Sequence, residues 1–123
     1  MEDILLKRAK SMLRDAFYDL EQGDYSLALF HAEQAVQLAM KHVLFMKIGD
    51  FPKTHSLSRL FKEAGKVEEK ALREYEENLE LVYVLEDAYI TSRYLPREYD
   101  EEIARRAVSF AEKMVREAEQ WTK

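Results

Sequence analysis

The stretch ALFHAEQAVQLAMKHVLF, residues 28–45, decides the fold of this chain. When it is wound as a helix at about 100° per residue, its polar positions fall on one narrow arc, which holds Glu33, Gln34, Gln37 and Lys41. The rest of the circumference is apolar. Such a helix lies at the centre of a bundle, or another subunit covers its spare face. We interpret the polar arc as a solvent-exposed stripe; the alternative is that it lines a groove facing Arg93.

The segments on either side of this stretch also have helical periodicity, and none shows sustained alternation of polar and apolar residues. The pattern predicts helices near residues 3–22, 24–48, 67–94 and 100–122, and a short helix between Pro52 and Gly65. Short connections between long helices favour antiparallel neighbours. We therefore predict an all-α fold, an up-and-down antiparallel bundle of four long helices plus one short helix, forming a single domain over residues 1–123.

Composition excludes several classes of protein. The chain has 123 residues, no cysteine and a formal net charge of −5. The absence of cysteine excludes disulfides and thiolate metal sites and favours a cytoplasmic location. No apolar run approaches the ~18 residues of a transmembrane helix, so no membrane association is expected. The negative charge disfavours non-specific wrapping of DNA but allows a local basic site.

The segment FPKTHSL, residues 51–57, opens the short helix. Thr54 is placed to cap that helix, the free N–H groups of the first turn would form an anion site, and Lys53 would add a cation at its rim. The simpler interpretation, which the sequence alone favours, is that Thr54 is only a cap and His55 lies on the surface. The other two histidines, His31 and His42, are too far apart to share a metal, and we interpret both as core residues bonded to neighbouring helices.

The segment YVLEDAYITSRYLPREY, residues 83–99, is the second candidate site. Glu86 and Asp87 lie seven and six residues before Arg93, about two helical turns, which predicts an internal ion pair that holds helices in register. The functional alternative is that Arg93 and Tyr94 contact phosphate and stack on a base. The chain has no glycine-rich phosphate loop and no hydrolase or zinc-protease motif, so the residues alone indicate no enzyme, no metal and no cofactor.

Three stretches together resemble the HEPN family, the nucleotide-binding helical domain of prokaryotes and eukaryotes. They are ALFHAEQAVQLAMKHVLF at 28–45, KTHSLSRLF at 53–61 and YITSRYL at 89–95. The chain is most similar to the small stand-alone prokaryotic members that are associated with a nucleotidyltransferase. The resemblance implies a homodimer that works with a small nucleotidyltransferase, often as a toxin–antitoxin pair. On this basis nucleotide or RNA would contact Gln34, Lys41, Lys53, Thr54, His55, Arg93 and Tyr94.

Several HEPN proteins are metal-independent ribonucleases that use an arginine followed four to six residues later by a histidine. Here Arg93 is followed by Tyr94, Leu95, Pro96, Arg97, Glu98 and Tyr99, with no histidine. We therefore predict a non-catalytic nucleotide- or RNA-binding or partner-binding module. The resemblance also makes Tyr94 or Tyr99 a candidate acceptor of AMP from the partner.

Two alternatives remain open. One is a metal-independent ribonuclease with a degenerate site, built on His55 and Arg93. The other is a helical protein-interaction scaffold, since LEQGDYSLALFHAEQA resembles a tetratricopeptide turn. No second copy follows ~34 residues later, as such repeats require.

Overall fold

The computed structural model describes residues 3–94 and 98–123, without the side chains of residues 92–94. Its described part contains six helices and no strands. They are α1 (Ile4–Glu21), α2 (Tyr25–Ile48), α3 (Leu57–Gly65), α4 (Glu69–Glu77), α5 (Leu79–Tyr94) and α6 (Glu101–Trp121). The predicted all-α class is correct. No helix in the described ranges is long and apolar enough to cross a membrane.

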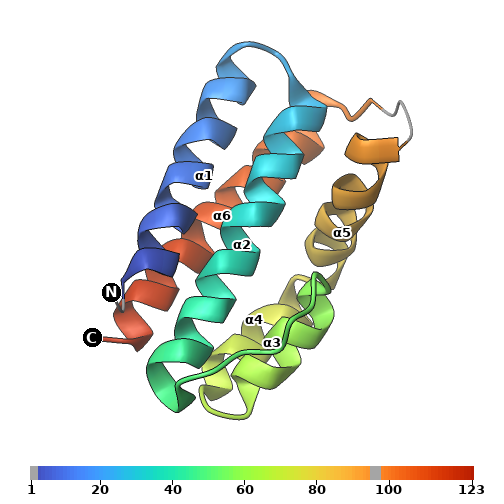
Figure 1. Ribbon diagram of the computed structural model, residues 1–123. Helices are drawn as coiled ribbons and strands as arrows, with labels where there is room; N and C mark the ends of the chain where they lie inside the picture. Colours follow the sequence, from blue (N-terminus) through green and yellow to red (C-terminus); the bar gives the residue numbers. More distant parts are fainter. Residues whose placement is uncertain (1–2, 95–97) are drawn as a thin grey trace.

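The long helices α1, α2, α5 and α6 run alternately up and down, and the short helices α3 and α4 cross the lower end of the bundle (Figure 1). Helix α2 packs against α1, α3, α5 and α6, so it is the central helix. Four of its alanines, Ala28, Ala32, Ala35 and Ala39, are fully buried. Small side chains at these positions let the neighbouring helices approach closely, which explains the central place of α2.

The ends of α2 follow from local chemistry. The side chain of Asp24 caps its first turn by accepting a hydrogen bond from the backbone N–H of Leu27 at 3.3 Å, a position that aspartate favours. Its last turn ends at Gly49, which has a φ of 77° in the left-handed region. Glycine adopts this conformation without steric cost. The predicted helix over residues 24–48 is therefore correct to within a residue.

The predicted continuous helix over residues 67–94 is wrong, because the chain breaks it at Asn78. Asn78 has a φ of −131° and a ψ of 31°, and its side-chain amide donates to the backbone carbonyl of Glu74 at 2.8 Å. Asparagine competes in this way for backbone groups and so favours helix ends. Helices α4 and α5 result, in place of the single long helix predicted over residues 67–94.

Candidate functional site

Three aromatic rings form a ladder from α2 across α5 to the segment before α3, beside a groove lined by α5 and that segment. The ring of Phe30 on α2 stacks on Tyr89 of α5, with centroids 6.2 Å apart and planes at 8°. Tyr89 in turn stacks on His55, with centroids 5.3 Å apart and planes at 25°. Offset stacking of this kind adds to the stabilisation from burial. Because His55 is exposed, the ladder ends at the surface with a ring.

The first turn of α3 lies directly beside this ladder. Ser56 caps the helix by accepting from the N–H of Arg59 at 3.2 Å. The predicted cap, Thr54, is wrong: its hydroxyl oxygen instead accepts from the N–H of Ser56 at 3.1 Å. This places Thr54 in the turn before the helix, since a hydroxyl that bonds two residues on stabilises a turn. Thr54 therefore comes too early in the chain to cap α3.

An internal carboxylate occupies the anion site that was predicted at this helix end. Glu86 of α5 accepts from the hydroxyl of Ser56 at 3.3 Å, and from the N–H and hydroxyl of Ser58 at 3.4 and 3.1 Å. A carboxylate is favoured there by the free N–H groups and the dipole of α3. The predicted partner of Glu86 was Arg93, whose side chain lies outside the described residues.

The polar arc of α2 does not face solvent, so the favoured interpretation of it is wrong. Glu33 is 0% exposed and Gln37 is buried, while Gln34 and Lys41 are half-buried. The carboxyl group of Glu33 accepts from the side-chain amides of Gln34 at 2.8 Å and Gln37 at 2.6 Å. Buried polar groups are tolerated when they are bonded in this way. The arc is an internal polar network between α2 and α5.

Burial dominates the electrostatics of this network. Burial is the largest influence on Glu33 and raises the pKa of its carboxyl group to about 7. The charge of Glu86 raises this pKa further, whereas the two amide hydrogen bonds and the charge of Lys41 lower it. Burial also lowers the pKa of Lys41. The Lys41 ammonium lies over the ring of Phe51, 5.6 Å from its centroid, a cation–π contact. Near neutral pH the carboxyl group of Glu33, which lies beneath the groove, is therefore partly protonated.

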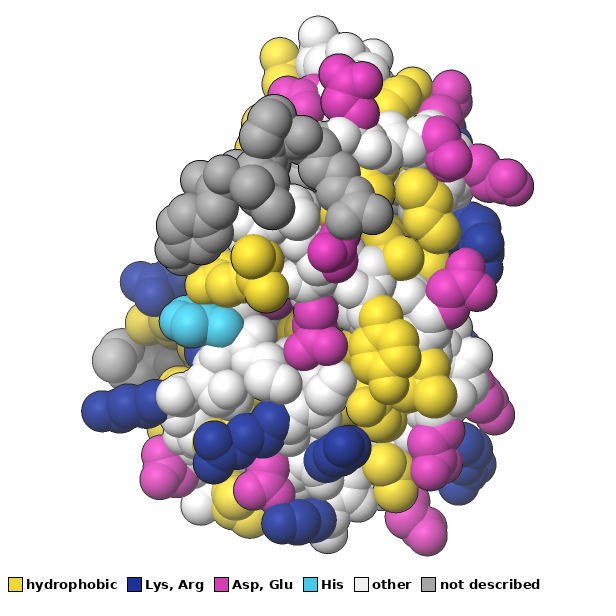
Figure 2. Space-filling view, turned by 90° about the vertical axis from the view of Figure 1, so that its right-hand side faces the viewer, with side chains coloured by type: hydrophobic (Ala, Val, Ile, Leu, Met, Phe, Trp, Pro, Cys, Tyr) yellow, Lys and Arg dark blue, Asp and Glu magenta, His cyan; other side chains and the backbone are white. Residues whose placement is uncertain are grey.

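A cavity of about 250 Å³ opens beside the ladder. His55 and Ser56 line one side, and Glu86, Tyr89 and Ile90 of α5 line the other. On the face of the molecule shown in Figure 2, a histidine and hydrophobic side chains lie next to an acidic one, with basic side chains gathered below them. An aromatic and aliphatic wall with a few polar groups is the usual composition of a small-molecule site.

The predicted contact residues thus divide into groups. Thr54 and His55 lie at the groove and Lys53 is exposed on the same segment, whereas Gln34 and Lys41 belong to the polar network beneath. Arg93 and Tyr94 are in the last turn of α5, and their side chains lie outside the described residues. Sequence reasoning missed Phe30 as the inner ring of the ladder and Glu86 as a groove residue. The spacing of Phe30 one turn before Gln34 was the available signal.

The two other histidines are structural, as predicted. The Nδ1 atom of His31 is 2.6 Å from the carboxylate of Asp19 on α1, and the Nε2 atom of His42 is 3.1 Å from the hydroxyl of Thr122 after α6. Both join α2 to its neighbours. Among residues 3–94 and 98–123, no group of three or more His, Asp or Glu side chains is placed to hold a metal ion.

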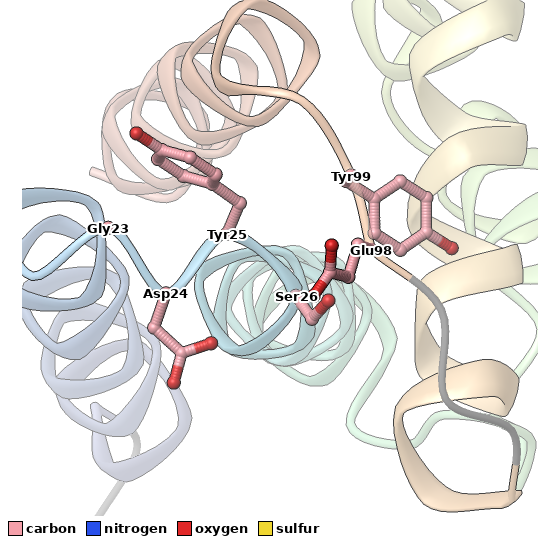
Figure 3. A pocket seen from close by; sticks show the side chains of 6 residues that line it. All are labelled: Gly23, Asp24, Tyr25, Ser26, Glu98 and Tyr99. Atoms are coloured by element: carbon pink, nitrogen blue, oxygen red, sulfur yellow. The ribbon is translucent and has the colours of Figure 1, made fainter.

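A second cavity, of about 340 Å³, lies at the end of the bundle where α2 begins (Figure 3). Asp24 and Glu98 bring two carboxylates to its wall, beside Tyr25, Ser26 and Tyr99. This lining repels phosphate, so the larger cavity is the poorer nucleotide site. Helix α5 provides partners for Tyr99, whose hydroxyl donates to Asp87 at 2.6 Å and lies 3.1 Å from the hydroxyl of Thr91.

Comparison with known proteins agrees with this geometry. The family model of the HEPN domain matches residues 3–121. The chain belongs to the HEPN domain family. The crystal structure of TT1696 from Thermus thermophilus is similar to it, with a TM-score of 0.77 and 27% sequence identity over 98% of this chain and 97% of that one. A search of curated proteins gives no match. The proposed resemblance to the HEPN family is confirmed.

Proposed function

We propose that this HEPN domain is a non-catalytic module that binds a nucleotide or RNA in the groove between α5 and the segment before α3. Membership of the HEPN family implies a nucleotide- or RNA-related module. The observation that carries the proposal is the ladder Phe30–Tyr89–His55, which ends with an exposed ring beside the 250 Å³ cavity. Base stacking on such a ring is worth about 1–3 kcal/mol per base and tolerates any sequence.

The cations near the ladder suit a phosphate backbone. Lys53 is exposed two residues before His55, and Arg59 and Lys62 are exposed on α3. Figure 2 shows basic side chains grouped on this part of the face. Exposed lysines and arginines bind phosphates without reading sequence. Arg93, four residues after Tyr89 on α5, is proposed to add a further phosphate contact. Gln34 and Lys41 would then act from beneath the groove and not as direct contacts.

The working partner that we propose is a small nucleotidyltransferase, with the chain itself a homodimer and the pair acting as a toxin and an antitoxin. The support is the likeness to nucleotidyltransferase-associated HEPN proteins. Tyr99 is the described candidate acceptor of AMP, and its hydroxyl lies 2.6 Å from the carboxylate of Asp87, a group able to accept its proton. The other candidate, Tyr94, has a side chain outside the described residues.

Binding of a short single-stranded RNA, measured by fluorescence anisotropy over a range of salt concentrations, tests the proposed site. His55→Ala removes the outer ring and is expected to weaken binding about tenfold, which corresponds to ~1.4 kcal/mol. Lys53→Ala is expected to reduce the slope of log K against log salt by about 1, the effect of one lost phosphate contact.

Lys7→Ala is the matched control, because Lys7 is an exposed lysine on α1, away from the groove. Equal affinities for the parent, His55→Ala and Lys53→Ala would refute the site. Gel analysis of the RNA after each titration separates binding from cleavage. RNA cut by the parent but not by His55→Ala would favour the ribonuclease alternative.

A further inference from the structure

The cavity beside the ladder has a chemistry that distinguishes between bases. Its volume of about 250 Å³ is below the ~300–1,000 Å³ of pockets for drug-sized ligands, so it suits a single ring system. The rings of His55 and Tyr89 are already in contact with each other, so a base cannot enter between them. It can lie only inside the cavity, against the exposed lining residues His55 and Ile90.

The polar groups that Glu86 and Ser56 bring to the cavity accept hydrogen bonds and offer no free proton. An ionised carboxylate such as Glu86 is an acceptor only. The hydroxyl of Ser56 already donates to Glu86 at 3.3 Å and accepts from the N–H of Arg59 at 3.2 Å. If a ligand turned hydrogen-bond acceptors toward Glu86 and Ser56, its negative partial charges would face theirs and repel them. If it turned donors toward them, those donors would form hydrogen bonds.

Glu86 has capacity for such an edge. A carboxylate has about four acceptor positions, and the three hydrogen bonds that it receives from Ser56 and Ser58 are 3.1–3.4 Å long. Charge-assisted hydrogen bonds are usually about 2.7–2.9 Å long when they are well formed. The present contacts are therefore loose. One acceptor position is free, so a ligand edge with two donors would use that position and displace one of the three present contacts.

We propose that this cavity binds guanine, with the carboxylate of Glu86 accepting from the N1–H and N2 amino groups of the base. This inference rests on the proposed nucleotide function and adds its base specificity. Guanine presents two adjacent donors on its Watson–Crick edge. Adenine and cytosine each present an amino group beside an unprotonated ring nitrogen, and uracil presents one N–H between two carbonyls. A site built on hydrogen bonds discriminates strongly against analogues that leave its groups unpaired.

Isothermal titration calorimetry of the full chain with GMP, IMP, AMP, CMP and UMP tests the specificity. We expect GMP to bind at least about tenfold more tightly than AMP, CMP or UMP. IMP, which keeps the N1–H but lacks the amino group, should fall between GMP and AMP. These measurements use the unmodified chain and so do not depend on the folding of a variant.

Glu86→Gln tests the residue. The variant should bring the ratio of GMP to AMP affinity close to one, because glutamine offers only one acceptor oxygen. If Glu86 only caps α3, the variant lowers the melting temperature and the ratio of GMP to AMP affinity stays as in the parent; that outcome overturns the proposal. Amide NMR spectra of the variant establish that it is folded.

The remaining outcomes separate this inference from the proposed function. Equal binding of all five nucleotides, abolished by His55→Ala, would refute guanine specificity and leave the nucleotide module intact. No binding of any nucleotide or of single-stranded RNA would refute both. A preference for GMP that survives Glu86→Gln would assign the recognition to another residue and also refute the proposal.

Discussion

Glu33 shows at the scale of a single residue how burial decides protonation. Its carboxyl group is fully buried beneath the groove, and burial raises its pKa from 4.5 to about 7. The folded chain therefore holds a proton at Glu33 that the unfolded chain releases at lower pH. The charges that act on it come from Lys41 on its own helix and from Glu86 on α5. This residue contributes a pH-dependent term to stability.

The sign of that term follows from linkage. The contribution of Glu33 is fully present below pH 4.5 and is lost as the pH rises through about 7. The loss is at most about 3 kcal/mol, since one pKa unit corresponds to about 1.4 kcal/mol. We expect Glu33→Gln, which cannot ionise, to flatten the fall in unfolding free energy over this range. Urea denaturation of the parent and the variant at several pH values measures this fall in unfolding free energy.

Glu117 requires a control in this experiment, because it titrates in the same range. Burial and the neighbouring Glu74 raise the pKa of Glu117 to about 7. Glu117→Gln should remove the part of the pH dependence of stability that comes from Glu117 and leave the part that comes from Glu33. An identical slope in the parent and in Glu33→Gln would show that the buried carboxyl is not protonated in the folded chain.

At the scale of the helical element, Gly65 sets the distance between α3 and α4. A Cβ atom on Gly65 would lie 2.7 Å from the Cβ of Leu72, closer than two such atoms approach. In an open helix alanine is about 1 kcal/mol more favourable than glycine. Here we expect Gly65→Ala to lower the unfolding free energy, by about 1–3 kcal/mol, as overpacking does. Urea denaturation of the variant and the parent measures the difference.

Gly49→Ala is the matched control for this substitution. Gly49 has a φ of 77°, and nothing lies within 4 Å of the position of its Cβ. Its substitution costs about 1–2 kcal/mol through backbone strain alone. Gly65→Ala combined with Leu72→Gly, which removes the opposing Cβ atom, should cost less than the sum of the two single substitutions, whereas Gly49→Ala with Leu72→Gly should be additive. A Gly65→Ala variant as stable as the parent would contradict the close approach of α3 and α4.

The elements also show how far the sequence predicts this fold. The bounds of α1, α2 and α6 follow from periodicity and from local signals such as Asp24 and Gly49. The break at Asn78 was missed because the apolar pattern continues through it; the local signal was the asparagine itself, whose amide bonds to the backbone of Glu74 four residues earlier. The polar arc of α2 gave the wrong exposure for a tertiary reason: whether Glu33 is buried depends on the helices that pack around α2, and periodicity does not place them. Of the candidate site, His55 was named from the sequence, while its ladder needed the packing of Phe30 and Tyr89.

At the scale of the whole molecule, α5 has an outer apolar surface. Leu79, Tyr83 and Ile90 are 38%, 55% and 56% exposed along it, and Figure 2 shows hydrophobic side chains gathered on this face. Apolar surface of this kind is typical of an interface. It is consistent with the proposed homodimer.

Leu79→Lys tests the dimer, and Leu27→Lys is its matched control. Leu27 on α2 is 39% exposed, nearly the same as Leu79. In Leu79→Lys a dimer that forms through α5 would lose a leucine from its interface and would have to desolvate the introduced charge. Together these effects should weaken the dimer by at least about tenfold. Sedimentation velocity over a concentration series should show no such change for Leu27→Lys. A parent chain that sediments as a monomer at every concentration would refute the homodimer.

The groove at the end of the aromatic ladder is where we place nucleotide or RNA binding. Amide NMR of the purified chain, titrated with ATP or GMP and then with a short single-stranded RNA, tests this most directly. We predict shifts that saturate and cluster on residues 53–58 and 86–91. A flat titration, or shifts that gather instead at the acidic cavity around Asp24 and Glu98, would contradict the proposed site and make the ladder a purely structural contact between α2 and α5.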